Sequence, residues 1–330
     1  LGRILSWFDF ERQVLRMPLA FLPDPDVIIV SSPSPLTILN GLRLRRHYGC
    51  KLVFEVRDIW PLVLVAVGEV SPRNPGVKFL AWVERLGYRR ADLIVGTMPN
   101  LCEHVVDVGG TANSVVCVPQ GIDPALLAPP QLLARDYIDT YIPGNKFIVC
   151  HAGSIGADNA IETLLTCARE MKDRKDIHFL LVGEGYLKEK FHAITGDLAN
   201  VTFAPGIPKA AVQSLLARVD LVYFAAHKSP LMRFGQSLNK VIDYMLSGKP
   251  ILASFTGYHS MINEAGCGSF VPAEDVHSLR DEIERYAAMP KEQRERLGAR
   301  GRSWLLEHRV YDKLAAGYLR HMHIAERAKP

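Results

Sequence analysis

The sequence lacks most of the features that would place it in a membrane, secreted or nucleic-acid-binding class. Its six cysteines are scattered, without the paired spacing of a zinc site or a disulfide framework, which fits a reducing cytoplasm. No apolar run approaches the ~20 residues of a transmembrane helix, and the charged, aromatic first 20 residues are unlike a signal peptide. No long Lys/Arg block accompanies the net charge of +4, so we expect no nucleic-acid partner.

Length and composition indicate instead a globular protein of about two domains. The chain has 330 residues, of which 48% are hydrophobic and 22% are charged. This share of apolar residues is sufficient for a sizeable core in each domain.

The order of apolar runs predicts strands that alternate with helices in both halves of the chain. The first ~20 residues are expected to form an amphipathic helix whose apolar side includes Ile4 and Leu19. The other elements of the first half are helices at 36–46, 75–90 and 101–108 and strands at 27–30, 52–56, 92–95 and 115–118. The second half is expected to have strands at 147–151, 178–182, 201–203, 221–224 and 251–254, with helices between them and only helices thereafter.

This alternation predicts an α/β fold class: two doubly wound, Rossmann-like domains of parallel strands, with an interdomain cleft where ligands of such sheets bind. The expected boundaries are a first domain at 1–127, a proline-rich linker at 128–144 and a second domain at 145–305. A C-terminal helix at 306–330 is expected to pack back on the first domain.

Residues 237–250, with the sequence SLNKVIDYMLSGKP, form the most informative stretch. Ser237 and Asn239 are suited to cap a helix, and the free amides of its first turn, with Lys240 nearby, suit a phosphate. Asp243, about one turn further on, is placed to accept both hydroxyls of a ribose. An ordinary amphipathic helix with a good cap explains the same residues and remains the alternative.

Glycine-containing turns follow three strands expected in the second half. They read HAGSIG at 151–156, VGEG at 182–185 and APGIP at 204–208. Glycine allows backbone amides to approach a phosphate or sugar closely, although tight strand–helix turns use glycine as well. Three such turns ahead of residues 237–243 therefore indicate a nucleotide site more strongly than any one of them.

Five motifs follow one another over most of the chain: FEVRDIWP, VPQGID, HAGSIG, LVGEG and FGQSLNKVIDYMLSGKP. With these motifs the chain resembles the retaining glycosyltransferases of family 4, which have the two-domain GT-B fold. It is most similar to bacterial members that transfer sugars onto lipid-linked acceptors. The resemblance implies that the domain at 1–127 faces the acceptor and that the domain at 145–305 binds a nucleotide-sugar.

The resemblance also implies roles for individual residues. Those that would bind the donor are Gly153, Ser154, Gly156, Glu184, Gly185, Ile207, Gly235, Ser237, Leu238, Asn239, Lys240 and Asp243. The loop at 153–156 would line the diphosphate and donor sugar, and positions 184, 185 and 207 would contact base and ribose. Positions 237–240 would hold the phosphates and Asp243 the ribose hydroxyls. Arg57 and Asp58 stand where the family often places a catalytic or acceptor-side pair.

Three departures from the family pattern affect these implications. Where members commonly have two glutamates eight positions apart, this chain has Gly235 and Asp243, so one carboxylate toward the donor sugar is lost. The HAGSIG turn is not followed by the family's phosphate-binding Arg/Lys pair, which leaves Lys240, Arg233 or Lys228 as counter-charges. The chain also opens in what resembles a later helix, without a preceding strand and glycine-rich loop. We therefore expect a fragment with an incomplete first domain, an open sheet edge and exposed apolar surface.

Two side chains have structural alternatives to a chemical role. Asp58 would orient the acceptor or assist its deprotonation, but a salt bridge with Arg57 at the end of a buried strand explains both residues equally well. His151, at a strand end, fits a packed core position better than a general base.

The resemblance implies a retaining, metal-independent transferase that needs no cofactor. The donor is expected to be UDP-linked, for example to an N-acetylhexosamine, and the acceptor a lipid-linked saccharide of cell-surface lipopolysaccharide or exopolysaccharide. Retention without an obvious nucleophile indicates same-face attack, in which the leaving phosphate accepts the proton of the acceptor hydroxyl.

We expect a cytoplasmic chain in which the basic run RLRR at 43–46 contacts an anionic membrane peripherally, with a solvated helix end as the alternative. Two other functions stay open: a truncated, inactive nucleotide-binding remnant, and a nucleotide-sugar epimerase of similar architecture.

Overall fold

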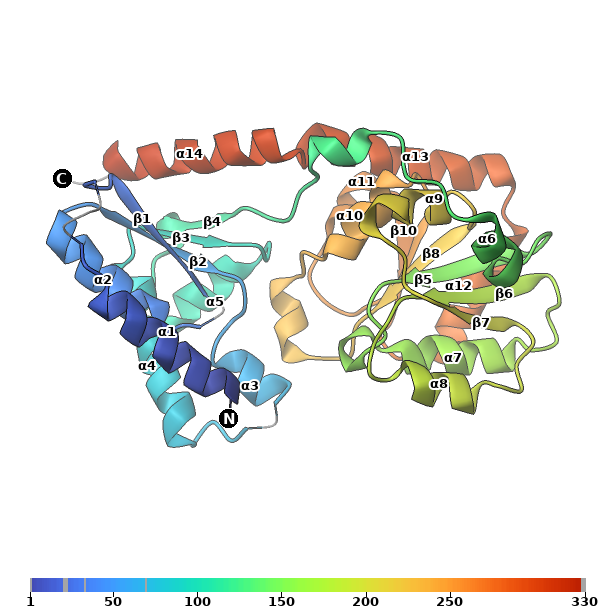
Figure 1. The fold of residues 1–330 in the computed structure, drawn as a ribbon, viewed down its shortest axis with the longest axis horizontal. Helices are drawn as coiled ribbons and strands as arrows, with labels where there is room; N and C mark the ends of the chain where they lie inside the picture. The colour runs from blue at the N-terminus through green and yellow to red at the C-terminus, as the bar shows by residue number, and fades with distance from the viewer. Residues whose placement is uncertain (1, 20–22, 33, 69, 328–330) are drawn as a thin grey trace. The chain divides into compact units, whose positions relative to one another are not determined.

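The computed structural model describes residues 2–19, 23–32, 34–68 and 70–327 (Figure 1). Internal contacts divide the chain into two compact units. The first consists of Leu1–Pro119, Ser229–Ser237 and Ala315–Pro330, and the second of Gln120–Lys228 and Leu238–Leu314. Some sequence predictions lie outside the described residues: those for Leu1, for Ala20, for the Ile4 side chain and for the last three positions of the segment 306–330.

The first unit is built on a four-stranded parallel sheet with the order β1-β2-β3-β4. Its strands are β1 (Val27–Ser32), β2 (Lys51–Val56), β3 (Leu93–Gly96) and β4 (Val115–Cys117). Its helices are α1 (Gly2–Arg16), α2 (Thr37–Tyr48), α3 (Leu62–Ala66), α4 (Pro75–Arg90) and α5 (Leu101–Val108), the 3₁₀ helices η1 (Ala112–Ser114) and η5 (Pro230–Phe234), and the part of α14 (Tyr311–Arg327) from Ala315 onward. The parallel sheet predicted for this half is confirmed.

Both faces of the first sheet are buried at its central strands, β2 and β3. On one face, Phe54 of β2 and Ile38 of α2 share a core cluster with side chains of α4 and α5. On the other face, Val53 packs in a cluster that includes Tyr318 of α14, whose hydroxyl donates a hydrogen bond to Glu55 Oε1 at 2.9 Å. Burial on two faces explains why β2 is a nearly continuous apolar run rather than an alternating one.

The second unit is built on a six-stranded parallel sheet with the order β10-β9-β8-β5-β6-β7. Its strands are β5 (Phe147–Ala152), β6 (Ile177–Val182), β7 (Val201–Ala204), β8 (Leu221–Ala225), β9 (Ile251–Ser254) and β10 (Gly268–Val271). The chain winds outward from β5 to β7 and then returns to β8 beside β5. The winding direction therefore reverses between β5 and β8, and the carboxyl ends of these strands are where doubly wound sheets bind ligands.

Helices cover both faces of the second sheet (Figure 1). They are α6 (Arg135–Tyr141), α7 (Ile161–Glu170), α8 (Lys188–Ile194), α9 (Val212–Leu216), α10 (Asn239–Leu246), α11 (Met261–Ala265), α12 (Val276–Ala288), α13 (Lys291–His308) and the first turn of α14, with the 3₁₀ helices η2 (Pro124–Leu127), η3 (Ala157–Asn159) and η4 (Lys209–Ala211). Leu164 of α7 and Ile283 of α12 pack in one core cluster with Val149 of β5 and Leu252 of β9. The loops that follow the strands are thus held by a sheet whose central strands are buried.

Two segments differ from the sequence predictions. The stretch 128–144, expected to be a linker, contains α6, whose Tyr137 hydroxyl donates to the Pro205 carbonyl at 2.8 Å. The expectation of only helices after residue 254 is wrong, because β10 pairs with β9 in parallel. The β10 sequence GSFV is short and starts with glycine, so its strand character depends on pairing with β9, not on its own pattern.

Candidate functional site

The loops after β5 and β6 lie against each other at the carboxyl end of the second sheet. A Cβ added to Gly183 would lie 1.9 Å from the Gly153 carbonyl oxygen, and one added to Gly185 would lie 2.1 Å from that of Ile155. Gly153 N–H donates to Val182 O at 2.9 Å, and Ile155 N–H donates to Glu184 O at 2.9 Å. Glycine is therefore required here by the close approach of two backbones, as the loop sequences indicated.

Glu184 connects these loops to the loop after β7. Its carboxylate accepts hydrogen bonds from Gly206 N–H at 2.9 Å and from Lys188 Nζ at 3.0 Å. The Gly206 amide and the Lys188 ammonium lower the pKa of Glu184 below its usual range, so the side chain is ionised. The structure thus brings Glu184 next to the loop that contains Ile207, two positions predicted to act on the same base and ribose.

A pocket of about 640 Å³ opens beside the Glu184 loop. Tyr186 lines it, and its hydroxyl also accepts a hydrogen bond from Ala157 N–H at 3.2 Å. Tyr186 is 76% exposed as a residue, and its ring lies 3.3 Å from the position that a Cβ of Gly156 would take. Sequence reasoning missed Tyr186, although an exposed aromatic directly after a glycine turn is a signal for a stacking surface.

The helix α10 begins at Asn239, with Leu238 at its N-cap position and no side-chain capping bond. The prediction that Ser237 or Asn239 caps this helix is therefore wrong: Ser237 lies before the cap and Asn239 lies inside the first turn. Val241 N–H donates to Leu238 O at 3.1 Å, and without a capping side chain the amides of Asn239 and Lys240 are left for solvent or a ligand.

Lys240 of α10 reaches the loop after β5 and is largely buried there. Its Nζ donates to Asn159 Oδ1, and Asn159 Nδ2 donates to Ser154 O at 2.9 Å. Burial lowers the pKa of Lys240 to about 8. No carboxylate of the described chain forms an ion pair with this ammonium group. Sequence reasoning assigned Lys240 to the phosphates but missed Asn159, which is 81 positions away and carries no local signal.

His151, the penultimate residue of β5, lies beneath this loop and is fully buried. Its Nε2 donates to the Ser154 carbonyl at 3.3 Å. Burial, followed by the charge of Lys240, lowers the pKa of His151 to about 3, so the imidazole is neutral at physiological pH. A neutral, buried imidazole positions the loop and does not carry protons to solvent.

Asp243, one turn after Lys240, is held by Lys209 of η4. Lys209 Nζ lies 2.5 Å from each carboxylate oxygen, and Gln213 Nε2 donates to the Asp243 carbonyl at 3.0 Å. The Asp243 side chain is 14% exposed and borders a small cavity of about 170 Å³. The ion pair with Lys209 was not predicted, and the ribose role of Asp243 stays a prediction.

The remaining predicted residues belong to the first unit. Arg57 and Asp58 follow β2 and are exposed, and Arg57 Nε donates to Ser31 Oγ at 3.1 Å. Gly235 ends η5 with φ of 83°, in the left-handed region that disfavours a side chain, and Ser237 closes the same segment. Their roles also stay predictions.

Arg233, one of the candidate counter-charges for a phosphate, already has carboxylate partners in the structure. Arg233 of η5 pairs with Glu103 and, at 3.1 Å, with Asp107, both on α5. Lys240 forms no such ion pair among the described residues, and the choice of Lys240, Arg233 or Lys228 as the counter-charge stays a prediction.

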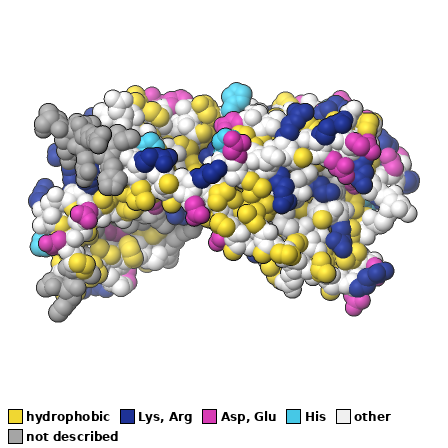
Figure 2. All heavy atoms as spheres, turned by 90° about the horizontal axis from the view of Figure 1, so that it is seen from above, with side chains coloured by type: hydrophobic (Ala, Val, Ile, Leu, Met, Phe, Trp, Pro, Cys, Tyr) yellow, Lys and Arg dark blue, Asp and Glu magenta, His cyan; other side chains and the backbone are white. Residues whose placement is uncertain are grey.

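Two features are absent from the described residues. Within them, no cluster of three or more His, Cys, Asp or Glu side chains has the arrangement of a metal site. None of the described helices combines the length and apolar character needed to cross a membrane. On the face drawn in Figure 2, Lys and Arg side chains are interspersed with Asp and Glu, so that face carries no broad field of one sign.

Two family models match the chain in its two halves. Residues 2–121 match the glycosyl transferase 4-like domain, and residues 146–288 match the glycosyl transferases of group 1. A curated relative, the probable glycosyltransferase WbjE of Pseudomonas aeruginosa, is 23% identical over 260 residues, or 77% of this chain. The match spans 64% of the length of that relative.

Solved structures with the same architecture include two that cover nearly the whole chain. Sucrose-phosphate synthase of Thermosynechococcus elongatus has a TM-score of 0.71 at 19% identity, over 97% of this chain and 77% of its own. HepE of Anabaena has a TM-score of 0.65 at 16% identity, over 91% of this chain and 78% of its own. At these identities the likeness establishes the fold.

Proposed function

We propose that this chain, which has the GT-B fold and matches glycosyltransferase models over both halves, transfers a sugar from a nucleotide-sugar to an acceptor hydroxyl. The family models, the curated relative and the fold support the glycosyltransferase assignment. Family 4 membership, retention of configuration, independence from metals and a lipid-linked acceptor are the finer parts of the proposal.

The observation that carries the proposal is the largely buried ammonium of Lys240, which donates to Asn159 but forms no ion pair with a carboxylate of the described residues, beside the glycine loops after β5 and β6. A buried cation without a carboxylate partner is unfavourable by itself, which is why its pKa falls to about 8. An anion bound at this point would stabilise its charged form. The departing nucleoside diphosphate is such an anion, and its negative charge increases as the bond to the sugar breaks.

The surrounding groups suit the same leaving group. Val241 N–H of the first turn of α10 donates to Leu238 O at 3.1 Å, but no side chain caps the helix, so the amides of Asn239 and Lys240 are placed to donate to a phosphate oxygen. Together with Lys240 they supply positive potential without a metal ion. This arrangement supports metal-independent departure of the diphosphate, with the proton of the acceptor hydroxyl passing to the leaving phosphate during same-face attack.

Asp243 is proposed to bind the ribose hydroxyls. A carboxylate offers about four acceptor directions, and the ammonium of Lys209 uses one on each oxygen. One direction on each oxygen remains for the two hydroxyls. Lys209 therefore acts as a positioning residue, which fixes the rotamer of Asp243.

A uridine base and a lipid-linked acceptor complete the proposal. HepE was solved in complexes with UDP and with UDP-glucose, which supports UDP as the first nucleotide to test. The lipid-linked saccharide and a role in polysaccharide synthesis at the cytoplasmic face of a membrane are taken from the sequence resemblance. The basic run at 43–46 supports contact with an anionic surface.

Calorimetric titration with UDP, with GDP and ADP as controls and no added metal, tests the nucleotide site. We expect selective UDP binding that is weakened at least tenfold in Lys240→Met. Lys190→Met on α8, which removes an exposed charge, is the matched control and should leave binding unchanged. A folded chain that binds no nucleotide would overturn the proposal. Binding of GDP or ADP alone would correct the base.

Two alternatives are separated by turnover assays on the same sample. A transferase releases UDP only when a sugar appears on an added lipid-linked saccharide, and NMR of the new anomeric proton reports retention. A remnant binds UDP but shows neither donor consumption nor transfer. An epimerase converts the UDP-sugar into its epimer without any acceptor.

A further inference from the structure

A second pocket lies in the first unit, at the carboxyl ends of α2 and α4, and has a volume of about 580 Å³. We call it the arginine pocket; its principal lining residues are Leu42, Arg45, Arg46 and Cys50 from α2 and the turn after it, with Leu86 and Arg90 from α4. Cys50 directly precedes β2, so the pocket lies at the starting ends of the strands. Arg57 and Asp58 follow the opposite end of β2. The arginine pocket is therefore separate from the predicted chemistry of this unit.

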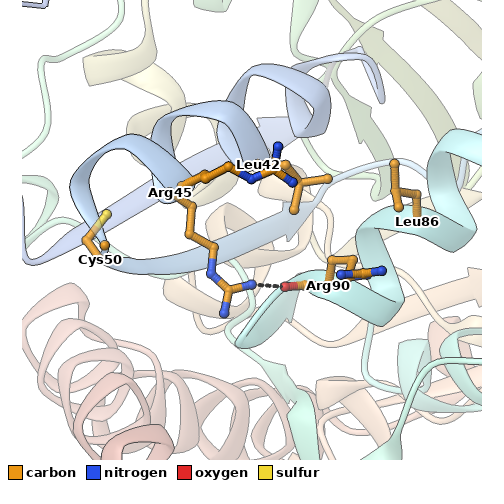
Figure 3. A pocket seen from close by; sticks show the side chains of 7 residues that line it. Leu42, Arg45, Cys50, Leu86 and Arg90 are labelled. Atoms are coloured by element: carbon orange, nitrogen blue, oxygen red, sulfur yellow. Dashed lines mark hydrogen bonds between the residues drawn. The ribbon is translucent and has the colours of Figure 1, made fainter.

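Arg45 has a structural role in this pocket. Figure 3 shows its side chain reaching from α2 to the end of α4, where Nη1 donates to the Arg90 carbonyl at 2.5 Å. Its Nη2 donates to Asp92 Oδ1 at 3.0 Å, and Asp92 Oδ2 accepts from Leu52 N–H at 2.9 Å. Arg45 thus caps α4 and ties it to the neighbouring strands.

Arg46 and Arg90 have no comparable role. Within the described part of the chain, neither guanidinium group forms an ion pair or a hydrogen bond. Basic residues at a helix end often satisfy its last carbonyls, but both ends are already closed here: Gly49 N–H donates to Arg45 O at 2.9 Å, and Arg45 caps α4. The two free guanidinium groups are thus not needed to cap either helix.

The charge of the pocket is positive. Among the residues that the structure describes, three arginines line it and no carboxylate does. The carboxylates of Asp92, which Arg45 engages, and of Asp26 act electrostatically on Cys50 and raise the pKa of its thiol, although burial raises it more. Arginine guanidinium groups match phosphate oxygens in a planar, two-point geometry, and repulsion among like charges is relieved when an anion binds. The side chains of Leu42 and Leu86 add apolar surface beside the charges.

We propose that the arginine pocket binds a phosphate group, held by Arg46 and Arg90, with an apolar part of the same ligand against Leu42 and Leu86. A phospholipid headgroup and a soluble phosphate ester share this chemistry. The proposal does not depend on the transferase activity, because it concerns a different edge of the sheet.

The test uses the whole chain and the double variant Arg46→Gln/Arg90→Gln. One arm measures co-sedimentation with phosphatidylcholine vesicles that contain phosphatidylglycerol, against pure phosphatidylcholine. The other arm titrates inorganic phosphate and glycerol 3-phosphate by calorimetry. The matched control, Arg296→Gln/Arg300→Gln, removes the same charge from two exposed arginines of α13. Circular dichroism checks that both double variants fold.

We expect phosphate-dependent binding in at least one arm, weakened at least tenfold in Arg46→Gln/Arg90→Gln and less than twofold in the control. Binding to vesicles alone identifies a lipid, and binding to glycerol 3-phosphate alone identifies a soluble ester. A single Arg90→Lys variant should lose part of the affinity, since lysine keeps the charge but not the two-point geometry. No binding in either arm, or equal losses in both double variants, would refute the arginine pocket as a site.

Discussion

Replacement of Lys240 by methionine should stabilise the free chain and at the same time impair nucleotide binding. The pKa of Lys240 falls from 10.5 to about 8 because burial disfavours its charged form. With about 1.4 kcal/mol for each pKa unit, the protonated side chain costs the folded state about 3 kcal/mol at neutral pH. Methionine removes this cost, but it also removes the hydrogen bond to Asn159, worth about 1 kcal/mol. The expected net gain in unfolding free energy is about 2 kcal/mol at pH 7.

The pH dependence of this gain has a defined sign. Because the folded-state pKa lies below the unfolded one, the unfolded chain holds the proton between about pH 8 and 10.5 while the folded chain has released it. The wild-type chain therefore becomes more stable as pH rises through this window. The advantage of Lys240→Met should be full below about pH 8 and should shrink steadily above it.

Urea unfolding of the whole chain at pH 6.5, 7.5, 8.5 and 9.5, followed by far-UV circular dichroism, measures the gain in stability and its dependence on pH. Lys190→Met is the control, because it removes an exposed lysine from the same unit. The same variants are titrated with UDP, whose affinity for the wild type should decline above about pH 8 as Lys240 loses its proton. A Lys240→Met chain that is less stable than the wild type at pH 7, or whose difference from it does not vary with pH, would refute the reasoning.

Three further variants test other parts of the site. Asp243→Ala should weaken UDP binding by about 1.5–3 kcal/mol in calorimetry, the value of a charged hydrogen bond, and unchanged affinity in a folded variant would remove its ribose role. Gly183→Ala should destabilise the chain by about 2 kcal/mol or more in urea unfolding and abolish UDP binding, because the new Cβ would lie 1.9 Å from Gly153 O. The control Gly196→Ala, which lies in an open turn, should change neither stability nor UDP binding. Because the pKa of His151 is near 3 in the folded chain, the unfolded chain takes up this proton first as pH falls below 6.5. The folded chain should therefore lose up to about 1.4 kcal/mol of stability per pH unit. His151→Gln should show a shallower loss between pH 6.5 and 5, and an identical slope would contradict the buried neutral imidazole.

Sequence patterns predict most of the fold because they report local preferences that the tertiary structure also satisfies. The helix expected at 75–90 is α4 at the same bounds, with Asn74 accepting from Gly76 N–H at its start. The helix expected at 101–108 is α5, which ends at the left-handed Gly109. By contrast, β10 was missed because four residues beginning with glycine have no periodicity of their own, and only pairing with β9 makes them a strand.

The glycine turns of the site were also predictable, since two backbones in contact at Gly183 and Gly153 leave no room for a side chain. The partners of the charged side chains in the site were not predictable from the sequence. Lys240 meets Asn159 across 81 positions, and Asp243 meets Lys209 across 34.

By itself, then, the sequence determined most of the segments that form strands, helices and tight turns, because hydrophobic periodicity and glycine act over a few neighbouring residues. Only the tertiary structure decided which charges are buried and which are paired. The strand order brings β5 beside β8 and β6, so the side chains that meet there depend on the packing of the whole sheet and not on their spacing in the chain.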